Sequence, residues 1–538
     1  MLLIVTSIVL LSTAQALVPK PYNIVNDNMA VEIGPGLGIH HDYPECGLLN
    51  KAIKRFEHNL RTRAMPRKDA GPVEGVVSQL RIEIANGCDE SHGLLWPSME
   101  MKESYNLSVR PLEMNISADE IWGAIHGLET LTQLAYGHPA GKIVIQAVQV
   151  NDKPRFPHRG YLIDTSRHFL PVSYILRFID AMSMVKMNVL HWHIVDDQSF
   201  PYVSLKFPGL SQNGSYNSKH YVYQPAEVQD ILEYARLRGI RVMPEFDTPG
   251  HTQSWGRGQP GLLTECYKGE KPNEYYGPFN PARNSTYDFM WKLLHELADV
   301  FPDKYLHLGG DEVDFRCWST NPEVLKFMNN MGMGRDFSAL QSYYIKQVVD
   351  MTRKVTTKPG MVPVVWQEVF DHGYRTDNNT IIHTWMGGDW KGELRRITAA
   401  GFKALFSSCW YLNYIGYGTD WVGPYRCDPT DIGGTPEQVK LILGGEATMW
   451  AEFVDETNLI SRSWPRGAAV AERLWSQPNL NAEEFKGRLN NLRCEMLRAG
   501  IPAEPVVGPG SCPPIVKEKK SLSGGLLSST VKKIKDIK

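Results

Sequence analysis

Apolar and polar positions alternate in two different rhythms along this chain of 538 residues. From about residue 159 onward, short apolar runs typical of buried strands alternate about eight times with amphipathic stretches typical of helices. Eight strand–helix repeats predict a (β/α)8 barrel, a closed parallel sheet inside a ring of helices. A last helix is expected at about residues 482–498.

The part before the barrel has another pattern. Between about residues 19 and 154 the order reads strand, helix, strand, strand, helix. Residues 80–84 alternate as in a half-buried strand, and a helix is expected after Glu120. The predicted fold class is therefore α/β: a (β/α)8 barrel preceded by a small α+β domain that carries no recognisable chemistry.

The two ends of the chain differ from the rest. Residues 1–16 form an apolar run that is too short for a membrane span and ends in Ala14-Gln15-Ala16, a pattern typical of a signal-peptidase site. The C-terminal tail is basic, and its Lys-, Ser- and Gly-containing composition predicts disorder. A solvated tail without a role is favoured over one that binds an acidic surface. The predicted parts are a signal peptide (1–16), an N-terminal domain (17–154), the barrel (155–512) and the tail (513–538).

Composition narrows the class of protein. A hydrophobic content of 42%, a charged content of 22% and a net charge of −2 are ordinary for a globular protein and give no reason to expect a nucleic-acid partner. No segment after the signal peptide is apolar for long enough to span a membrane. Five N-x-Ser/Thr sites fit a glycosylating secretory compartment, with lysosome and extracellular space left open. These sites are Asn106, Asn115, Asn213, Asn284 and Asn378.

Carboxylate, arginine and aromatic residues end nearly every predicted barrel strand. In a parallel barrel these ends lie on one face, around one pocket. The predicted strand ends are Asp164-Thr165-Ser166-Arg167, Asp196-Asp197, Glu245-Phe246-Asp247, Asp311-Glu312, Trp366-Gln367-Glu368, Thr384-Trp385, Trp410-Tyr411 and Trp450-Ala451-Glu452.

The Asp311-Glu312 pair stands out among these ends. It follows an apolar strand and two glycines, in the order Tyr-Leu-His-Leu-Gly-Gly-Asp-Glu-Val over residues 305–313. Carboxylates are costly to bury unless they are paired or shifted in pKa. The pair therefore indicates either an ion-pair network or a catalytic site.

These motifs together resemble family 20 glycoside hydrolases, in particular the animal lysosomal and secreted β-N-acetylhexosaminidases. The resemblance is dense from about residue 155 to 512 and weaker before it. It rests on His158-Arg159-Gly160, Asp164-Thr165-Ser166-Arg167-His168, His191-Trp192-His193-Ile194-Val195-Asp196-Asp197, Glu245-Phe246-Asp247-Thr248-Pro249-Gly250-His251 and His307-Leu308-Gly309-Gly310-Asp311-Glu312.

The resemblance implies a retaining exo-hydrolase without cofactor or metal. Such enzymes release terminal β-linked GlcNAc or GalNAc from glycoconjugates or chitooligosaccharides, and the 2-acetamido group of the substrate is the nucleophile. A homodimer is also implied. Glu312 is then the general acid and base, and Asp311 holds the acetamido N–H and steadies the oxazolinium charge.

The resemblance assigns the other pocket residues as well. Asp196 and His251 are a hydrogen-bonded pair beneath the acid, with a turn role as the alternative for His251. Arg167 binds the outer sugar hydroxyls, with an ion pair to Asp164 as its alternative; Arg159 is favoured for that structural pair. The remaining implied contacts are aromatic walls at Trp366, Trp385 and Trp450, a hydroxyl donor to the acetamido oxygen at Tyr411, and a carboxylate for the 4- and 6-hydroxyls at Glu452.

Two positions depart from the family pattern. Asn413 agrees with the pocket that admits 6-sulfated sugars, but Tyr414 replaces the cation of that pocket, so neutral sugars are the expected substrates. Among the eight cysteines the resemblance implies Cys46–Cys88, Cys266–Cys317 and Cys494–Cys512. Cys409 and Cys427 are left over, either as a further disulfide around Tyr411 and Asn413 or as two free thiols.

Two other readings compete with this hypothesis. His191-x-His193 places two imidazoles on one face of a strand, as in metal-dependent amidohydrolases, but no coherent set of further His ligands follows. A surface lectin could keep the fold without turnover. The presence of Asp311, Glu312 and Tyr411 favours the enzyme.

Overall fold

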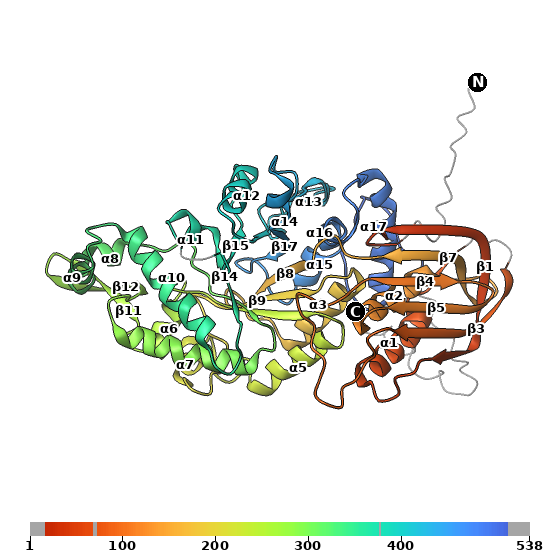
Figure 1. Ribbon diagram of the computed structural model, residues 1–538, viewed down its shortest axis with the longest axis horizontal. Coiled ribbons are helices and arrows are strands. Elements are labelled where there is room, and N and C mark those ends of the chain that lie inside the picture. Colours follow the sequence, from red (N-terminus) through yellow and green to blue (C-terminus); the bar gives the residue numbers. More distant parts are fainter. Residues whose placement is uncertain (1–16, 68–72, 376–377, 515–538) are drawn as a thin grey trace, which may run out of the picture.

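The computed structural model describes residues 17–67, 73–375 and 378–514. An α+β domain packs against one end of a (β/α)8 barrel (Figure 1). The predicted signal peptide and residues 515–538 of the predicted tail lie outside the described residues. Among the described helices, none is both long and apolar enough to cross a membrane.

The N-terminal domain is a seven-stranded sheet covered by two helices. The strand order is β1-β3-β5-β4-β7-β6-β2, and β1 also pairs with β7. The expected order placed two strands between the helices and none after the second helix. The structure has four strands between α1 and α2 and two more after α2, and of these β2 and β6 are too short to leave a periodic pattern. The elements are β1 (Asn23–His40), α1 (Gly47–Arg63), β2 (Met65–Pro66), β3 (Val73–Ile84), β4 (Tyr105–Val109), β5 (Leu112–Ala118), α2 (Ile121–Leu134), β6 (Ala135–Gly137) and β7 (Ile143–Asp152).

Eight parallel strands close the barrel, which confirms the predicted fold class. The strands are buried along almost their whole length because the neighbouring layers cover both faces, as is usual for parallel sheets. They are β8 (His158–Asp164), β9 (Val189–Val195), β10 (Arg241–Phe246), β13 (Tyr305–His307), β14 (Val362–Trp366), β15 (Ile381–Thr384), β16 (Ala404–Phe406) and β17 (Ile442–Met449).

Helices surround this barrel, and the last one has the bounds expected from the sequence. They are α3 (Val172–Met184), α4 (Gly209–Gly214), α5 (Pro225–Arg236), α6 (Gln253–Gly258), α7 (Asn284–Val300), α8 (Arg316–Thr320), α9 (Pro322–Asn330), α10 (Phe337–Lys354), α11 (Gln367–Asp371), α12 (Trp390–Ala399), α13 (Val422–Arg426), α14 (Pro436–Lys440), α15 (Leu459–Ser463), α16 (Arg466–Trp475) and α17 (Ala482–Arg498).

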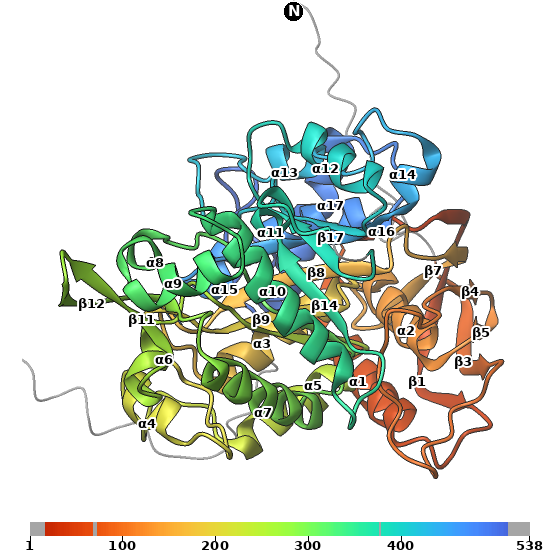
Figure 2. The same ribbon diagram turned by 60° about the vertical axis from the view of Figure 1, so that its left-hand side comes forward.

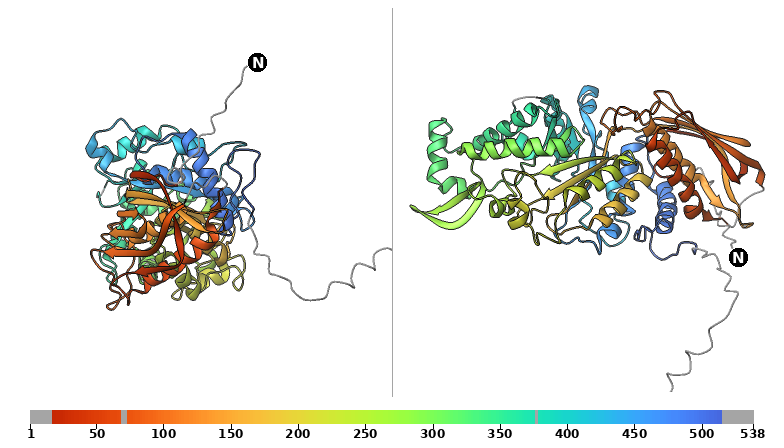
Figure 3. Two further views of the ribbon diagram at one scale, coloured as in Figure 1. Left: turned by 90° about the vertical axis from the view of Figure 1, so that its right-hand side faces the viewer. Right: turned by 90° about the horizontal axis from the view of Figure 1, so that it is seen from below.

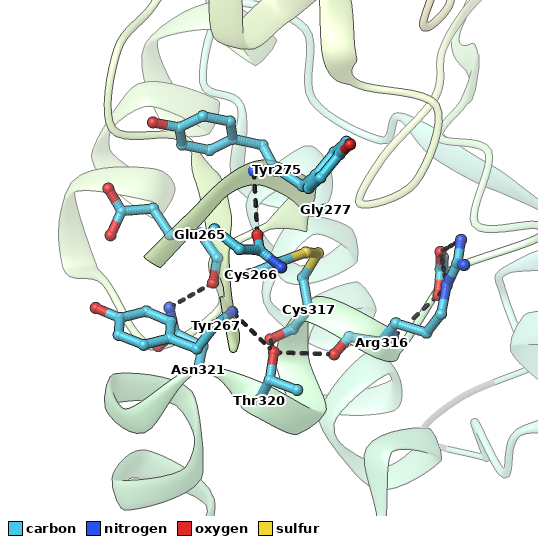
Figure 4. The surroundings of a disulfide bond; sticks show 12 residues. Glu265, Cys266, Tyr267, Tyr275, Gly277, Arg316, Cys317, Thr320 and Asn321 are labelled. Atoms are coloured by element: carbon cyan, nitrogen blue, oxygen red, sulfur yellow. Dashed lines mark hydrogen bonds and ion pairs between the residues drawn. A yellow bond between two sulfur atoms is a disulfide. The ribbon is translucent and has the colours of Figure 1, made fainter. Parts of the chain in front are cut away.

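A two-stranded hairpin, β11 (Leu263–Lys268) and β12 (Lys271–Phe279), projects from the barrel at the end far from the N-terminal domain (Figures 2 and 3). The disulfide Cys266–Cys317 ties it to α8, and the Tyr267 amide donates to Thr320 Oγ1 beside it (Figure 4). The other disulfides are Cys46–Cys88, Cys494–Cys512 and Cys409–Cys427, so the leftover cysteines of the sequence form a bond and not two free thiols.

Buried ion pairs join the two domains, and one of them corrects an expectation. Arg159 does not pair with Asp164. Its guanidinium donates to both carboxylate oxygens of Glu103, at 2.9 and 2.5 Å, and His126 Nε2 lies 2.9 Å from the same carboxylate. Arg159 lies near the start of β8, at the end of the barrel that faces the N-terminal domain. Asp164 is the last residue of the same strand and lies at the opposite end of the barrel.

Glu103→Gln should lower the free energy of unfolding by about 3–5 kcal/mol near neutral pH, because it leaves the buried Arg159 guanidinium without a counter-charge. Burial alone would raise the pKa of Glu103, but Arg159 and His126 lower it to about 2. The difference in free energy of unfolding between wild type and variant should therefore reach its full size above about pH 4.5 and vanish as the pH falls toward 2. Denaturant unfolding at several pH values measures it. Glu83→Gln, which removes an exposed pair with Arg81, is the control and should change little; an equally small effect at Glu103 would contradict the account.

Candidate active site

A pocket of about 470 Å³ opens at the carboxyl ends of the barrel strands. Eight of the predicted site residues line it: Arg167, Asp311, Glu312, Trp385, Tyr411, Asn413, Trp450 and Glu452. Three others, Asp196, His251 and Trp366, are not in its lining. The structure thus brings together residues from strand ends that are nearly 300 residues apart in sequence.

Two glycines allow the Asp311-Glu312 pair to enter this pocket. Gly309 and Gly310 have φ of 72° and 100°, and a Cβ atom at Gly309 would lie 1.6 Å from Asp247 Oδ1. The Gly310 amide donates to that same oxygen at 2.8 Å. Only glycine therefore lets the chain cross so close above Asp247.

Burial separates the two members of the pair. Asp311 is buried, whereas the side chain of Glu312 is 59% exposed. Glu312 also has φ of 49°, a left-handed conformation that costs a non-glycine residue about 1 kcal/mol or more. The backbone is therefore strained at the more exposed residue of the pair.

His251 connects the pair to Asp196. Its Nδ1 lies 3.1 Å from Asp196 Oδ1, while its Nε2 lies 3.7 Å from Asp311 Oδ2 and 3.6 Å from Glu312 Oε2. Burial disfavours the charged imidazole, but the Asp311 and Asp196 carboxylates outweigh it and raise the pKa of His251 well above its usual value. An imidazolium therefore lies between three carboxylates.

A buried column of alternating carboxylates and imidazoles continues this arrangement down the barrel interior. His193 Nε2 lies 2.9 Å from Asp196 Oδ2, and His193 Nδ1 lies 2.7 Å from Glu245 Oε2. His191 Nε2 lies 3.0 Å from Glu245, and His191 Nδ1 lies 2.6 Å from Glu446 Oε2. We call Glu446, His191, Glu245, His193 and Asp196 the buried column.

The contacts of the buried column test the hypothesis that His191 and His193 ligate a metal ion. Atoms of His191, Glu245 and His307 lie close enough together to ligate a metal ion, as do those of His191, His383 and Glu446. Each ring nitrogen of His191 and His193, however, already faces a carboxylate oxygen at 3.0 Å or less. These contacts fit an ion-pair network better than a ligand set.

Arg167 lines the pocket and makes the ion pair with Asp164 that the sequence left as the alternative to sugar binding. Its guanidinium lies 2.9 Å from Asp164 Oδ2 and 2.9 Å from Asp196 Oδ2, and its Cζ is 5.1 Å above the Trp450 ring. Glu452 Oε1 is 3.7 Å away. The ion pairs hold Arg167 in a fixed place in the pocket wall.

Aromatic rings form one side of the pocket. Trp385 and Tyr411 stack with centroids 6.0 Å apart, and Tyr411 and Trp450 lie 6.5 Å apart. Trp366 is only 1% exposed and donates its indole N–H to Glu245 Oε1 at 2.8 Å, so it supports Trp450 from below instead of lining the pocket.

The loop that carries Tyr411 begins earlier than expected. β16 ends at Phe406, four residues before the predicted strand end at Trp410, and Tyr411 instead forms an isolated bridge with Thr448 of β17. The apolar and aromatic residues after Phe406 resemble a strand in sequence although they form a loop. Cys409–Cys427 closes this loop.

Several pocket groups were not assigned from the sequence. Burial and the nearby Asp311 raise the pKa of Glu368 to about 8 and that of Asp247 well above its usual value. Glu368 accepts from the Trp385 indole at 2.8 Å. Both residues were recognised only as strand ends. Phe453 and Arg462 also line the pocket, and no signal in the sequence distinguished them.

The pocket is lined by a pair of carboxylates and by aromatic and polar side chains at the carboxyl ends of a (β/α)8 barrel. This combination is typical of glycoside hydrolases. Comparison with known proteins gives the family. Residues 156–478 match the model of the glycosyl hydrolase family 20 catalytic domain, and residues 17–134 match a domain described as beta-acetyl hexosaminidase like. The chain therefore belongs to glycosyl hydrolase family 20.

Relatives and solved structures cover nearly the whole chain. It is 45% identical to the beta-hexosaminidase subunit beta of Felis catus, over 91% of this chain and 90% of that protein. It is 47% identical to the subunit alpha of Bos taurus, over 85% and 84%. The chitobiase of Flavobacterium johnsoniae superposes with a TM-score of 0.78 at 30% identity, over 90% of this chain and 73% of that one.

Asp196→Asn should lower the pKa of His251 by about one unit or more, because one of its two principal carboxylate neighbours is lost while the burial remains. NMR titration of ring-labelled histidine measures this, with His251→Gln to assign the signal. An unchanged pKa of His251 would show that Asp196 does not control its charge.

Proposed function

We propose that this protein is an exo-β-N-acetylhexosaminidase that hydrolyses terminal β-linked GlcNAc and GalNAc with retention of configuration. One observation carries the proposal above the others. A buried Asp311 and an exposed Glu312 meet next to a recess walled by Trp385, Tyr411 and Trp450, where a 2-acetamido group would fit.

Glu312 donates its proton to the leaving oxygen in the first step. The carbonyl oxygen of the acetamido group bonds to the anomeric carbon as the glycosidic bond breaks, which gives an oxazolinium ion. Asp311 accepts a hydrogen bond from the acetamido N–H and stabilises the positive charge. The Tyr411 hydroxyl donates to the acetamido oxygen and aims it at the anomeric carbon.

The second step returns the proton. Glu312, now ionised, removes a proton from a water molecule whose oxygen bonds to the anomeric carbon, and the oxazolinium ring opens to the acetamido sugar. Because the anomeric carbon is inverted twice, the β configuration is retained. The imidazolium of His251, 3.6 Å from Glu312, stabilises the carboxylate form between the two steps.

Recognition of the outer sugar face is the proposed role of Arg167 and Glu452. The ion pairs of Arg167 with Asp164 and Asp196 fix its guanidinium before substrate arrives, so little side-chain entropy is lost on binding. Glu452 is half exposed, and its carboxylate, 3.7 Å from Arg167, accepts from two hydroxyls.

Neutral sugars are the preferred substrates in this proposal. Tyr414, which replaces the cation of a sulfate-binding pocket, is 73% exposed at the rim next to Asn413. Arg462 is another cation of the lining, and no carboxylate lies within 4.0 Å of it among the described residues.

We also propose that the protein enters the secretory pathway, resides in lysosomes or outside the cell, and acts as a homodimer. In the described chain, four of the five N-x-Ser/Thr asparagines are exposed and Asn115 is half-buried, so all are accessible to glycosylation. The mammalian relatives are named as subunits, which supports an assembly.

Glu312→Gln should lower kcat on a neutral aryl β-GlcNAc glycoside by at least about 10²-fold, because general acid–base catalysis is lost. Asp311→Asn should lower it by about 10²–10³-fold with the fold intact. Chromogenic assays and circular dichroism measure both, and Asp314→Asn, an exposed neighbour paired with Arg316, is the control. Wild-type rates in Asp311→Asn would refute the substrate-assisted mechanism, and an inactive wild type would favour the lectin.

Tyr414→Arg should raise the ratio of kcat/KM for 6-sulfo-GlcNAc over GlcNAc aryl glycosides by about tenfold, because it adds a charge-assisted contact to the sulfate. Arg462→Gln in the wild-type background should leave that ratio unchanged because, in this proposal, no cation of the described pocket lining binds a 6-sulfate. A fall in the ratio with Arg462→Gln would show that Arg462 already supplies the cation.

A further inference from the structure

A second cleft, of about 300 Å³, lies where the N-terminal domain meets the barrel. Its walls come from α1, α3, the segment after α5, and the end of α17, so both domains contribute. Arg238 precedes β10, which places the cleft toward the amino-terminal ends of the strands, on the side opposite the catalytic pocket. None of its lining residues lines that pocket.

Four arginines line this cleft: Arg55, Arg63, Arg238 and Arg498. Its lining contains one carboxylate, Asp180, which lies 2.7 Å from Arg238. Arg63 is paired with Glu129 and Glu495 at 2.6 and 3.0 Å. Two of the four guanidinium groups are thus neutralised within the protein.

The other two, Arg55 and Arg498, have no carboxylate within 4.0 Å in the part of the chain that the structure describes. Each donates once to a backbone carbonyl: Arg55 Nη2 to Leu237 at 2.8 Å, and Arg498 Nε to Thr62 at 3.2 Å. These contacts join α1 to the end of α5 and to the end of α17 across the domain junction. They use one nitrogen of each guanidinium and leave both arginines without a salt bridge to any described residue.

Two further observations indicate an excess of donors and of positive charge. Among the described residues, Arg63 Nε and Arg498 Nη1 are buried without a hydrogen-bond partner. Burial and the neighbouring Arg238 lower the pKa of Arg55 to about 10, against the opposing effect of Asp180. A protein seldom leaves guanidinium groups in such a state unless something else supplies the acceptors.

We propose that this junction cleft binds the oxyanion group of a phosphate or sulfate monoester about as large as a monosaccharide. Planar guanidinium groups bind tetrahedral oxyanions through paired, charge-assisted hydrogen bonds, and Arg55 and Arg498 provide the charge for one. The volume is at the lower end for small-molecule sites and exceeds what a bare ion needs. Because Arg55 belongs to α1 and Arg498 to α17, the ligand bridges the two domains.

Calorimetric titration of the intact protein tests this proposal, in a chloride buffer of constant ionic strength that lacks phosphate and sulfate. Glucose 6-phosphate should bind saturably and glucose should not; inorganic phosphate and inorganic sulfate separate a requirement for the ester from one for the oxyanion alone. Arg55→Gln and Arg498→Gln should each weaken glucose 6-phosphate binding about tenfold or more. Arg61→Gln, on the exposed side of α1, should bind like wild type.

The site itself is located by soaking crystals with tungstate, whose anomalous signal should appear within hydrogen-bonding distance of Arg55 and Arg498. Activity on a neutral aryl glycoside reports that the variants are folded. The proposal is overturned if wild type shows no saturable binding, if the cleft variants bind like wild type, or if tungstate is found only elsewhere. A variant that fails to fold leaves the wild-type titration and the tungstate position to decide.

Discussion

The buried column of alternating carboxylates and imidazoles is the constraint on which the catalytic geometry depends. A carboxylate in the barrel interior is tolerated only with a charged, hydrogen-bonded partner, and the same holds for an imidazolium. Burial would raise the pKa values of Glu245 and Glu446, but His307 and His193 in one case and His191 in the other hold them well below the usual range. Every ring and carboxylate along the column is thereby restricted to one orientation.

Asp196, at the pocket end of the buried column, connects the column to Asp311 and Glu312 through His251. Asp196 is shared by His193, Arg167 and His251, so its position fixes the Arg167 guanidinium and the His251 imidazolium at once. Gly309 and Gly310 then place Asp311 and Glu312 above His251. The result is a pair of adjacent carboxylates in unlike surroundings, one buried and one open to solvent, which is what two different catalytic roles require.

How much of this was predictable follows from the kind of interaction involved. The barrel and the location of the pocket were predictable from the sequence, because strand–helix alternation is periodic and the ends of parallel strands converge on one face. Roles for residues such as Glu452 and Tyr411 came from resemblance and not from periodicity.

The Arg159–Glu103 pair was missed because it joins two domains, and contacts between domains leave no local pattern. The end of β16 was misplaced because a loop rich in apolar and aromatic residues resembles a strand. The raised pKa values of Asp247 and Glu368 depend on burial and on proximity to Asp311, which no spacing in the sequence reveals.

The central claim is that the nucleophile belongs to the substrate and that Asp311 only manages it. The most direct measurement is kcat/KM for a series of aryl β-glycosides whose 2-acetamido group carries zero, one, two or three fluorines. If the acetamido oxygen attacks the anomeric carbon, each fluorine withdraws electron density from it, and the rate should fall steeply across the series, by orders of magnitude in all. A rate that is nearly independent of fluorination would mean that an enzyme carboxylate is the nucleophile and would contradict the account.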